Sequence, residues 1–204
     1  SRQSKILFEK VETIIDSVKK NGDKALIEYS SKYDNYIVSS ISELEVSKET
    51  LKNAYSTISF SDKSALNTAA DRIFRYHEHQ VLNNYSYQDE YGSEISMRVL
   101  PIERVGIYMP GGTAAYPSSV LMNAIPAKVA NVKEIVMVVP SPKGELNPMV
   151  LAAAHLTGVH RVFKIGGAHA IAALAYGTEK IPKVDKIVGP GNAYVAEAKK
   201  QVYG

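Results

Sequence analysis

Residues 104–112 have the sequence RVGIYMPGG, in which a short apolar stretch ending at Tyr108 runs directly into a proline and two glycines. The pattern returns at residues 163–169, FKIGGAH, and at residues 186–192, KIVGPGN. Each segment predicts a β-strand that stops at a glycine-rich turn and is followed by a helix. Strands that alternate with helices in this way are typical of a parallel sheet covered by helices on both faces.

The same alternation extends over the whole second half of the chain. We expect strands at 104–108, 134–139, 161–165 and 185–188, and helices at 118–130, 148–157, 168–176 and 193–202. Asn147 followed by Pro148 is a strong start for one of these helices, because it places an N-cap before a proline at the first helical position. Gly158 is a suitable stop for the same helix.

The first half of the chain predicts helices and one hairpin. Leu7, Val11, Ile14 and Val18 have helical spacing, and Asn21-Gly22 predicts the end of that helix. We expect three further helices. The first is capped by Asp23 and runs to Tyr33, and a polar loop at 34–46 follows it. The next is capped by Ser47, and the last runs from Asp62 to about Leu82. Tyr85–Gln88 and Glu94–Leu100 would form a hairpin through a turn at 91–93. The chain therefore divides, on this interpretation, into a helical segment with a hairpin at 1–103 and an α/β domain at 104–204.

The three glycine-rich turns predict a ligand site. In a parallel sheet they all lie at the carboxyl edge of the strands, where ligands bind in open α/β folds. Glycine lets a ligand approach the backbone, and the helix that follows offers free N–H groups to an anion. The turns present Tyr108, His169 and Asn192. The alternative is that these glycines only close tight turns, and neither standard phosphate-binding glycine motif is present.

Composition excludes several classes of function. The formal net charge is +3, and the basic residues are dispersed, which argues against nucleic acid as a partner. The chain has no cysteine, so disulfides, thiol nucleophiles and thiolate zinc sites are excluded within it. The first 20 residues mix charged and apolar side chains and do not predict a signal peptide or a membrane span. We therefore expect a cytoplasmic protein.

The remaining titratable residues do not predict a catalytic centre. His77 and His79 are two residues apart, which is poor spacing for two metal ligands on one helical face. His155 and His160 lie around a helix end and are expected to be capping or surface residues. No pair of carboxylates in the second half of the chain suggests acid–base chemistry.

Three segments resemble those of a known family. Arg104–Gly112 is similar to the R-V-G-x-Y-x-P-G-G segment of histidinol dehydrogenases. Lys164–Thr178 resembles the glycine-glycine-alanine segment of that family, and Val184–Val195 resembles its V-D-K-I-x-G-P-G-N segment. The order and spacing of the segments also fit, and the resemblance covers essentially the whole chain.

The resemblance implies an enzyme that oxidises L-histidinol to L-histidine with two NAD⁺, in the last step of histidine biosynthesis. It implies a zinc-dependent homodimer with incomplete Rossmann-like domains, related in fold to aldehyde dehydrogenases. The NAD contacts of the family fall on Tyr108, position 169 and Asn192. The family usually has glutamine at position 169, whereas this chain has His169.

The resemblance also implies that the chain is an N-terminal portion carrying an NAD half-site. The substrate-binding serine, zinc ligands and acid–base pair of the family lie beyond Gly204, so no catalytic or metal residue is assigned here. We expect the 204-residue chain to be inactive by itself and to self-associate. We also expect protonation of His169 to alter NAD binding between about pH 5 and 8. The alternatives are another aldehyde-dehydrogenase-like enzyme and a non-catalytic binding or assembly module.

Overall fold

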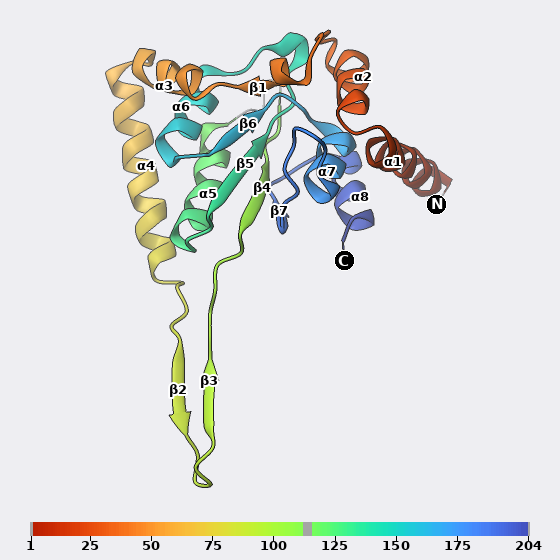
Figure 1. Cartoon of the computed structure of the whole chain (residues 1–204). Coiled ribbons are helices and arrows are strands. Elements are labelled where there is room, and N and C mark those ends of the chain that lie inside the picture. The colour runs from red at the N-terminus through yellow and green to blue at the C-terminus, as the bar shows by residue number, and fades with distance from the viewer. Residues whose placement is uncertain (1, 112–115, 204) are drawn as a thin grey trace.

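A parallel sheet forms the centre of the molecule. A computed structural model of the chain describes residues 2–111 and 116–203 (Figure 1). The sheet has the strand order β1-β6-β5-β4-β7, in which β1 is antiparallel to β6 and the other neighbours are parallel. The strands are β1 (Glu45–Val46), β4 (Arg104–Tyr108), β5 (Glu134–Val138), β6 (Arg161–Phe163) and β7 (Lys186–Val188). The α/β fold expected from the sequence is therefore confirmed.

Strand β4 shows how the sheet acquires a core on both faces. Val105 and Ile107 are buried in one core, whereas Tyr108 is buried in the other. Gly106 points to the same face as Tyr108, because a Cβ placed there would lie 2.9 Å from a methyl group of Leu174. Alternate side chains of a strand point to opposite faces, so both faces of this apolar strand must be covered by helices.

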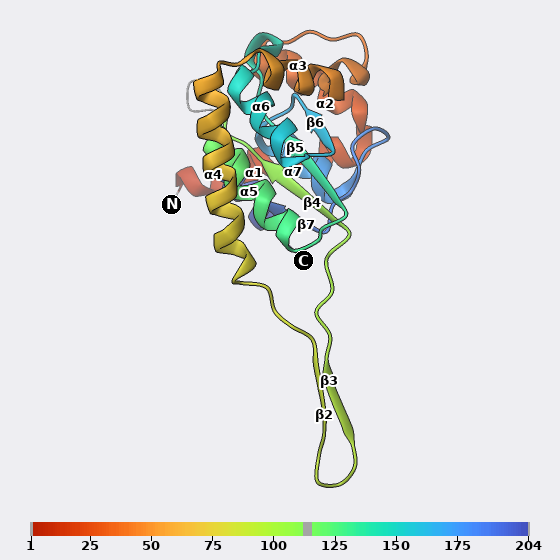
Figure 2. The same cartoon turned by 90° about the vertical axis from the view of Figure 1, so that its left-hand side faces the viewer.

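Helices from the described part of the chain cover both faces of the sheet (Figures 1 and 2). One face packs against α1 (Arg2–Asn21), α2 (Asp23–Asp34), α7 (Gly167–Tyr176) and α8 (Ala193–Gln201). The other packs against α3 (Lys48–Thr57), α4 (Phe60–Glu78), α5 (Pro117–Val129) and α6 (Pro148–Thr157). The helices of the first 103 residues thus contribute to both cores of the sheet that follows them, and the division at residue 103 stays a prediction.

A two-stranded arm projects from the body between α4 and β4 (Figure 1). It consists of β2 (Tyr85–Gln88) and β3 (Glu94–Met97), paired antiparallel with Tyr85 opposite Met97. Most of its side chains are exposed, including the large apolar or aromatic residues Val81, Leu82, Tyr85, Tyr87, Tyr91, Ile95, Val99 and Leu100. An isolated hairpin is marginally stable in water, so this arm is a surface suited to a packing partner.

The polar segment 34–46 differs from the expectation of a loop. It contains a short 3-10 turn at Ile41–Leu44, followed by β1 as the edge strand of the sheet. Ser40 caps the 3-10 turn, and the Glu43 carboxylate accepts a hydrogen bond from the Ser40 backbone N–H at 2.9 Å. Leu44 is fully buried and anchors the segment. The sequence did not predict this strand because the segment is polar and only Glu45 and Val46 pair with the sheet.

Two helix starts also differ from the expectation. Asp23 is the first residue of α2 and not its cap; Gly22 is the cap, without a side-chain hydrogen bond. The Asp23 carboxylate instead accepts a hydrogen bond from the Lys180 backbone N–H at 3.3 Å. Helix α4 begins at Phe60 because Ser59 caps it, and it ends at Glu78, four residues before the expected end. Among the described residues, no helix has the length and apolar character needed to cross a membrane.

Candidate cofactor site at the carboxyl edge of the sheet

Tyr108 connects the first two glycine-rich turns. It is the last residue of β4 and is 3% exposed. Its hydroxyl oxygen accepts a hydrogen bond from the Gly167 backbone N–H, with an N–O distance of 2.9 Å. Burial raises the pKa of the Tyr108 phenol, so the ring stays protonated and keeps a donor available. The side chain therefore ties the end of β4 to the N-terminus of α7.

Pro140 packs between the turns that follow β4 and β6. A Cβ at Gly111 would lie 2.5 Å from the Pro140 carbonyl oxygen, and a Cβ at Gly166 would lie 2.6 Å from the Pro140 Cβ. Such distances are too short for real contacts, so any larger residue would push the turns apart. Because these two positions are glycine, the ends of β4, β5 and β6 can pack closely against one another. Gly112 and Thr113, which the sequence also places in the first turn, lie outside the described residues.

The third turn contacts Tyr108 from the other side. Gly189 has φ +106°, and a Cβ there would collide with the Tyr108 carbonyl oxygen. Only glycine satisfies both the backbone conformation and the close approach. Asn192 caps α8, because its Oδ1 accepts a hydrogen bond from the Val195 N–H at 3.1 Å. Asn192 is exposed, so its side-chain NH₂ group is accessible at the edge of the sheet.

His169 lies near the same edge, but its ring is covered. It is 2% exposed and packs against Tyr29 and Tyr33 of α2, with ring centroids 5.2 and 6.0 Å away. Neither ring nitrogen has a hydrogen-bond partner among the described residues. Burial lowers the pKa of His169 to about 3. The expected titration between pH 5 and 8 is therefore wrong for this structure, because α2 removes the imidazole from water.

The C-terminal end of α2 brings a residue to this edge that the sequence did not indicate. Asp34 accepts a hydrogen bond from the Ser141 backbone N–H, just after β5, and burial raises the pKa of its carboxyl group. Its Oδ2 atom is buried without a partner among the described atoms. Asp34 ends a helix that starts 11 residues earlier. Sequence reasoning missed it because only packing of α2 against α7 carries it to the sheet edge.

The other histidines are accounted for by local contacts. His160 Nδ1 accepts a hydrogen bond from the Ile135 N–H at 3.0 Å, and the His155 ring packs 5.4 Å from the Tyr55 ring. His77 Nδ1 lies 2.6 Å from Gln80 Oε1, and His79 Nδ1 lies 2.7 Å from the Arg75 carbonyl oxygen. Over residues 2–111 and 116–203, no three histidine, aspartate or glutamate side chains come together as a metal site would require.

Comparison with known proteins identifies the family. The family model for histidinol dehydrogenase matches residues 1–204. The chain belongs to the histidinol dehydrogenase family. It is 56% identical over 194 residues to the histidinol dehydrogenase of Aromatoleum aromaticum, covering 95% of this chain and 44% of that protein. It is also 56% identical over 198 residues to that of Psychrobacter arcticus, covering 97% and 46%.

A solved histidinol dehydrogenase structure has the same fold as this chain. The crystal structure of histidinol dehydrogenase from Elizabethkingia anophelis superposes with a TM-score of 0.89 at 38% identity, over 95% of this chain and 44% of that one. The chain thus spans less than half the length of the histidinol dehydrogenases it matches. Because the chain belongs to this family, the alternative of another aldehyde-dehydrogenase-like enzyme is excluded.

Proposed function

We propose that this span supplies a half-site for NAD in a protein that oxidises L-histidinol to L-histidine in histidine biosynthesis. The observation that supports this most strongly is the position of Tyr108. Its hydroxyl group meets the turn before α7, and its carbonyl group meets the turn before α8. Three glycine-rich turns consequently surround one strand end at the carboxyl edge, where dinucleotides bind in open α/β sheets.

The described residues fit a dinucleotide. The Gly167 N–H at the start of α7 donates to the Tyr108 hydroxyl oxygen, but Gly166 provides no side-chain cap, so the next N–H groups of the first turn remain available to a pyrophosphate. The exposed amide of Asn192 can donate a hydrogen bond to a ribose or phosphate oxygen. Glycines 166, 189 and 191 let the turns pack closely against Pro140, Tyr108 and Val195, which fixes the turns around the proposed site. NAD, when bound, supplies the acceptor for the hydride removed from the substrate.

His169 fits this proposal only after a local movement. The ring lies beneath Tyr29 and Tyr33, and Tyr33 is 53% exposed at the end of α2. Displacing the Tyr33 ring would open a path from the sheet edge to the imidazole. His169 in its neutral form donates one hydrogen bond and accepts another, as the family glutamine does. We therefore propose that His169 contacts NAD as a neutral group.

The chemistry of the whole protein needs more than this span. Removing the hydroxyl proton of an alcohol requires a positioned base, and zinc requires three or four protein ligands. The described residues do not provide the ligand cluster, so no step through zinc is assigned to them. We propose that the 204-residue chain does not oxidise histidinol by itself. A homodimer, contacts of the apolar arm with further protein, and a cytoplasmic location stay predictions.

A calorimetric titration with NAD⁺ tests the half-site. The variant Asn192→Ser keeps a capping oxygen for α8 but removes the amide donor, so the thermal stability should change little. Its NAD⁺ affinity should fall about tenfold, the loss expected for one hydrogen bond to a charged group. Unchanged NAD⁺ affinity in Asn192→Ser would remove this residue from the site, and no NAD⁺ binding by the parent chain would reject the half-site.

A further inference from the structure

The parallel strands of the sheet have the order of the Rossmann dinucleotide-binding fold. They lie side by side as β6-β5-β4-β7, whereas their order along the chain is β4, β5, β6, β7. Counted from β4, this is the order 3-2-1-4, which reverses between β4 and β7. In the Rossmann fold an acidic residue at the end of the second strand accepts a hydrogen bond from the 2′-hydroxyl group of the adenosine ribose. The equivalent place in this sheet is the carboxyl end of β5.

Asp34 provides a carboxyl group at the end of β5. The first six residues after this strand, 139–144, have the sequence VPSPKG and contain no acidic residue. Asp34 reaches the same place from α2 and accepts a hydrogen bond from the Ser141 backbone N–H. Burial is the main cause that raises the pKa of Tyr108, and the charge of Asp34 raises it further, so Asp34 is also close to the end of β4. A residue from another part of the chain thus takes the place of the acidic residue of the second strand.

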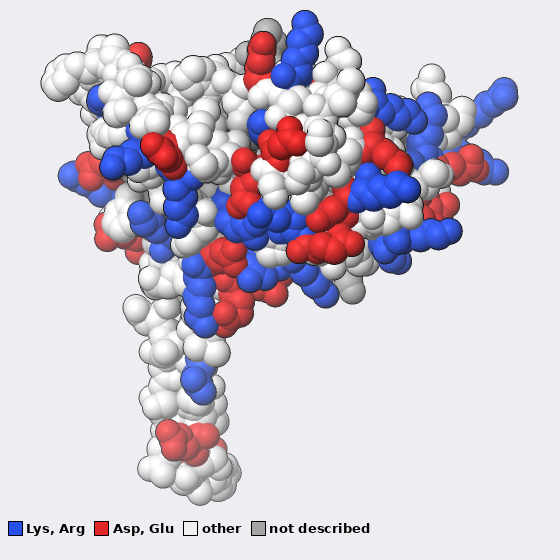
Figure 3. Space-filling model, turned by 45° about the horizontal axis from the view of Figure 1, so that its top comes forward, with Lys and Arg blue, Asp and Glu red and all other residues white. Residues whose placement is uncertain are grey.

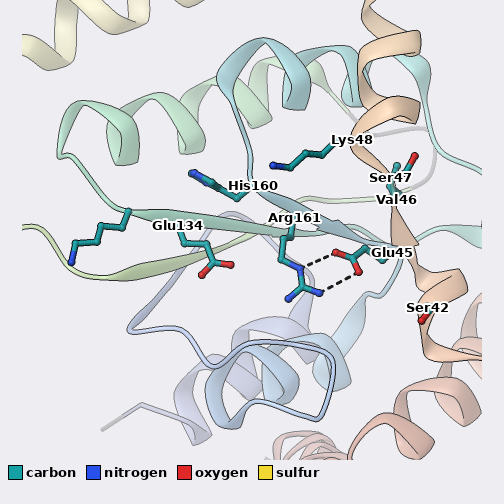
Figure 4. A pocket seen from close by; sticks show the side chains of 9 residues that line it. Ser42, Glu45, Val46, Ser47, Lys48, Glu134, His160 and Arg161 are labelled. Atoms are coloured by element: carbon teal, nitrogen blue, oxygen red, sulfur yellow. Dashed lines mark hydrogen bonds and ion pairs between the residues drawn. The ribbon is translucent and has the colours of Figure 1, made fainter.

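The carboxyl group of Asp34 lacks the partners that other carboxylates of the molecule have. Figure 3 shows acidic and basic side chains interleaved over the body. At the amino edge of the sheet, for example, Glu45 accepts hydrogen bonds from Arg161 Nε at 2.8 Å and Nη2 at 3.2 Å (Figure 4). Asp34 has no ion pair with any residue that the structure describes. Its charge is therefore not neutralised within the described part of the chain.

Buried polar atoms without a partner gather around the end of α2. Among the described residues, four buried side-chain atoms have no hydrogen-bond partner: Asp34 Oδ2, Ser30 Oγ and the two ring nitrogens of His169. Ser30 and Asp34 belong to α2, and His169 belongs to α7, which packs against α2. Buried polar groups in folded proteins nearly always have a partner. This cluster therefore indicates a place where a ligand supplies the missing hydrogen bonds.

We propose that Asp34 determines the specificity of the half-site for NAD over NADP, by accepting a hydrogen bond from the 2′-hydroxyl group of the adenosine ribose. This inference rests on the proposed NAD function. A ribose hydroxyl group donates to a carboxyl oxygen, and Oδ2 has no other donor. The 2′-phosphate of NADP is a dianion at about pH 8 and has no proton to donate. It would meet the acidic side chain acceptor against acceptor, without a basic group to compensate.

The two sides of the proposed site fit the two ribose groups of a dinucleotide. Tyr108 and the start of α7 lie in the middle, where the pyrophosphate is proposed to bind. Asp34 lies toward β5 and Asn192 follows β7, and these strands flank β4 on opposite sides. Tyr33 and Asp34 are consecutive residues in the last turn of α2. A movement of this turn that displaces the Tyr33 ring from His169 also uncovers Asp34 Oδ2.

Calorimetric titrations of the 204-residue chain with NAD⁺ and with NADP⁺ at about pH 8 test this proposal. The parent chain should bind NADP⁺ about tenfold more weakly than NAD⁺. Asp34→Asn keeps the shape of the side chain and an acceptor for the Ser141 N–H, but it removes the charge. The ratio of the two affinities should therefore fall about tenfold in this variant. Glu28→Gln, at an exposed position of the same helix, removes the same charge and should keep the ratio of the parent.

Two results would overturn the role of Asp34 and leave the half-site intact. One is equal affinity of the parent chain for NAD⁺ and NADP⁺, a comparison that needs no variant and does not depend on how Asp34→Asn folds. The other is a ratio of affinities that is the same in Asp34→Asn as in the parent, or that changes equally in Asp34→Asn and Glu28→Gln. If the parent chain binds neither nucleotide, the half-site itself is rejected, and the role of Asp34 with it.

Discussion

Replacing His169 by glutamine should make the folded protein more resistant to acid. In the native structure burial lowers the pKa of His169 to about 3, whereas the ordinary value is 6.5. Below pH 6.5 the unfolded chain therefore binds a proton that the native chain does not, and the free energy of unfolding falls as the pH falls. One pKa unit corresponds to about 1.4 kcal/mol, and the unfolded histidine is already half protonated at pH 6.5, so lowering the pH from about 6.5 to about 4.5 should cost the parent about 2.3 kcal/mol through this residue alone.

Urea unfolding of the parent and of His169→Gln at these two pH values measures the effect. Contributions from the carboxylates are common to both proteins, so the difference between their pH dependences isolates position 169. We expect the parent to lose about 2.3 kcal/mol more than the variant. His155→Gln, at an exposed position on α6, is the control and should follow the parent. Equal losses in the parent and His169→Gln would mean that the imidazole is accessible to protons, and the burial argument would fail.

Four further substitutions test particular contacts of the structure. Tyr108→Phe removes the acceptor of the Gly167 N–H and should lower the free energy of unfolding by about 1–2 kcal/mol, measured by urea unfolding, while also weakening NAD⁺ binding. Gly189→Ala should cost about 3 kcal/mol, because it combines a positive φ with a collision, whereas Gly92→Ala, with a positive φ in open space, should cost about 1 kcal/mol. The Glu45 carboxylate accepts hydrogen bonds from Arg161 at 2.8 and 3.2 Å, so Glu45→Gln should cost about 2 kcal/mol at neutral pH. Because the native pKa of Glu45 is lowered, that difference should shrink as the pH falls below 4.5.

The parts of the fold that were predictable from sequence are those with a strong local pattern. The strand ending at Tyr108 and the helix at Pro148–Thr157 lie where apolar runs, caps and glycines placed them. Strand β1 was not predictable, because two residues carry no periodicity and only pairing with β6 makes them a strand. The end of α4 was predicted too late because no glycine or proline marks the end of the helix at Glu78.

The candidate site was predictable in outline and not in detail. Glycine-rich turns after parallel strands indicated that Tyr108 and Asn192 belong to the carboxyl edge. The burial of His169 was not visible in the sequence, because Tyr29 and Tyr33 lie about 140 residues away along the chain and reach it only through packing of α2 on α7. Asp34 was missed for the same reason: a tertiary contact brings it to the edge of the sheet.

The most direct test of the proposed NAD half-site is an amide NMR titration of the chain with NAD⁺. The proposal predicts saturable shifts at Gly167, Gly189 and Asn192, with weaker binding in Tyr108→Phe and no shifts at the amino edge around His160. Saturable shifts confined to the amino edge, or an NAD⁺ affinity that is the same in Tyr108→Phe as in the parent chain, would contradict it.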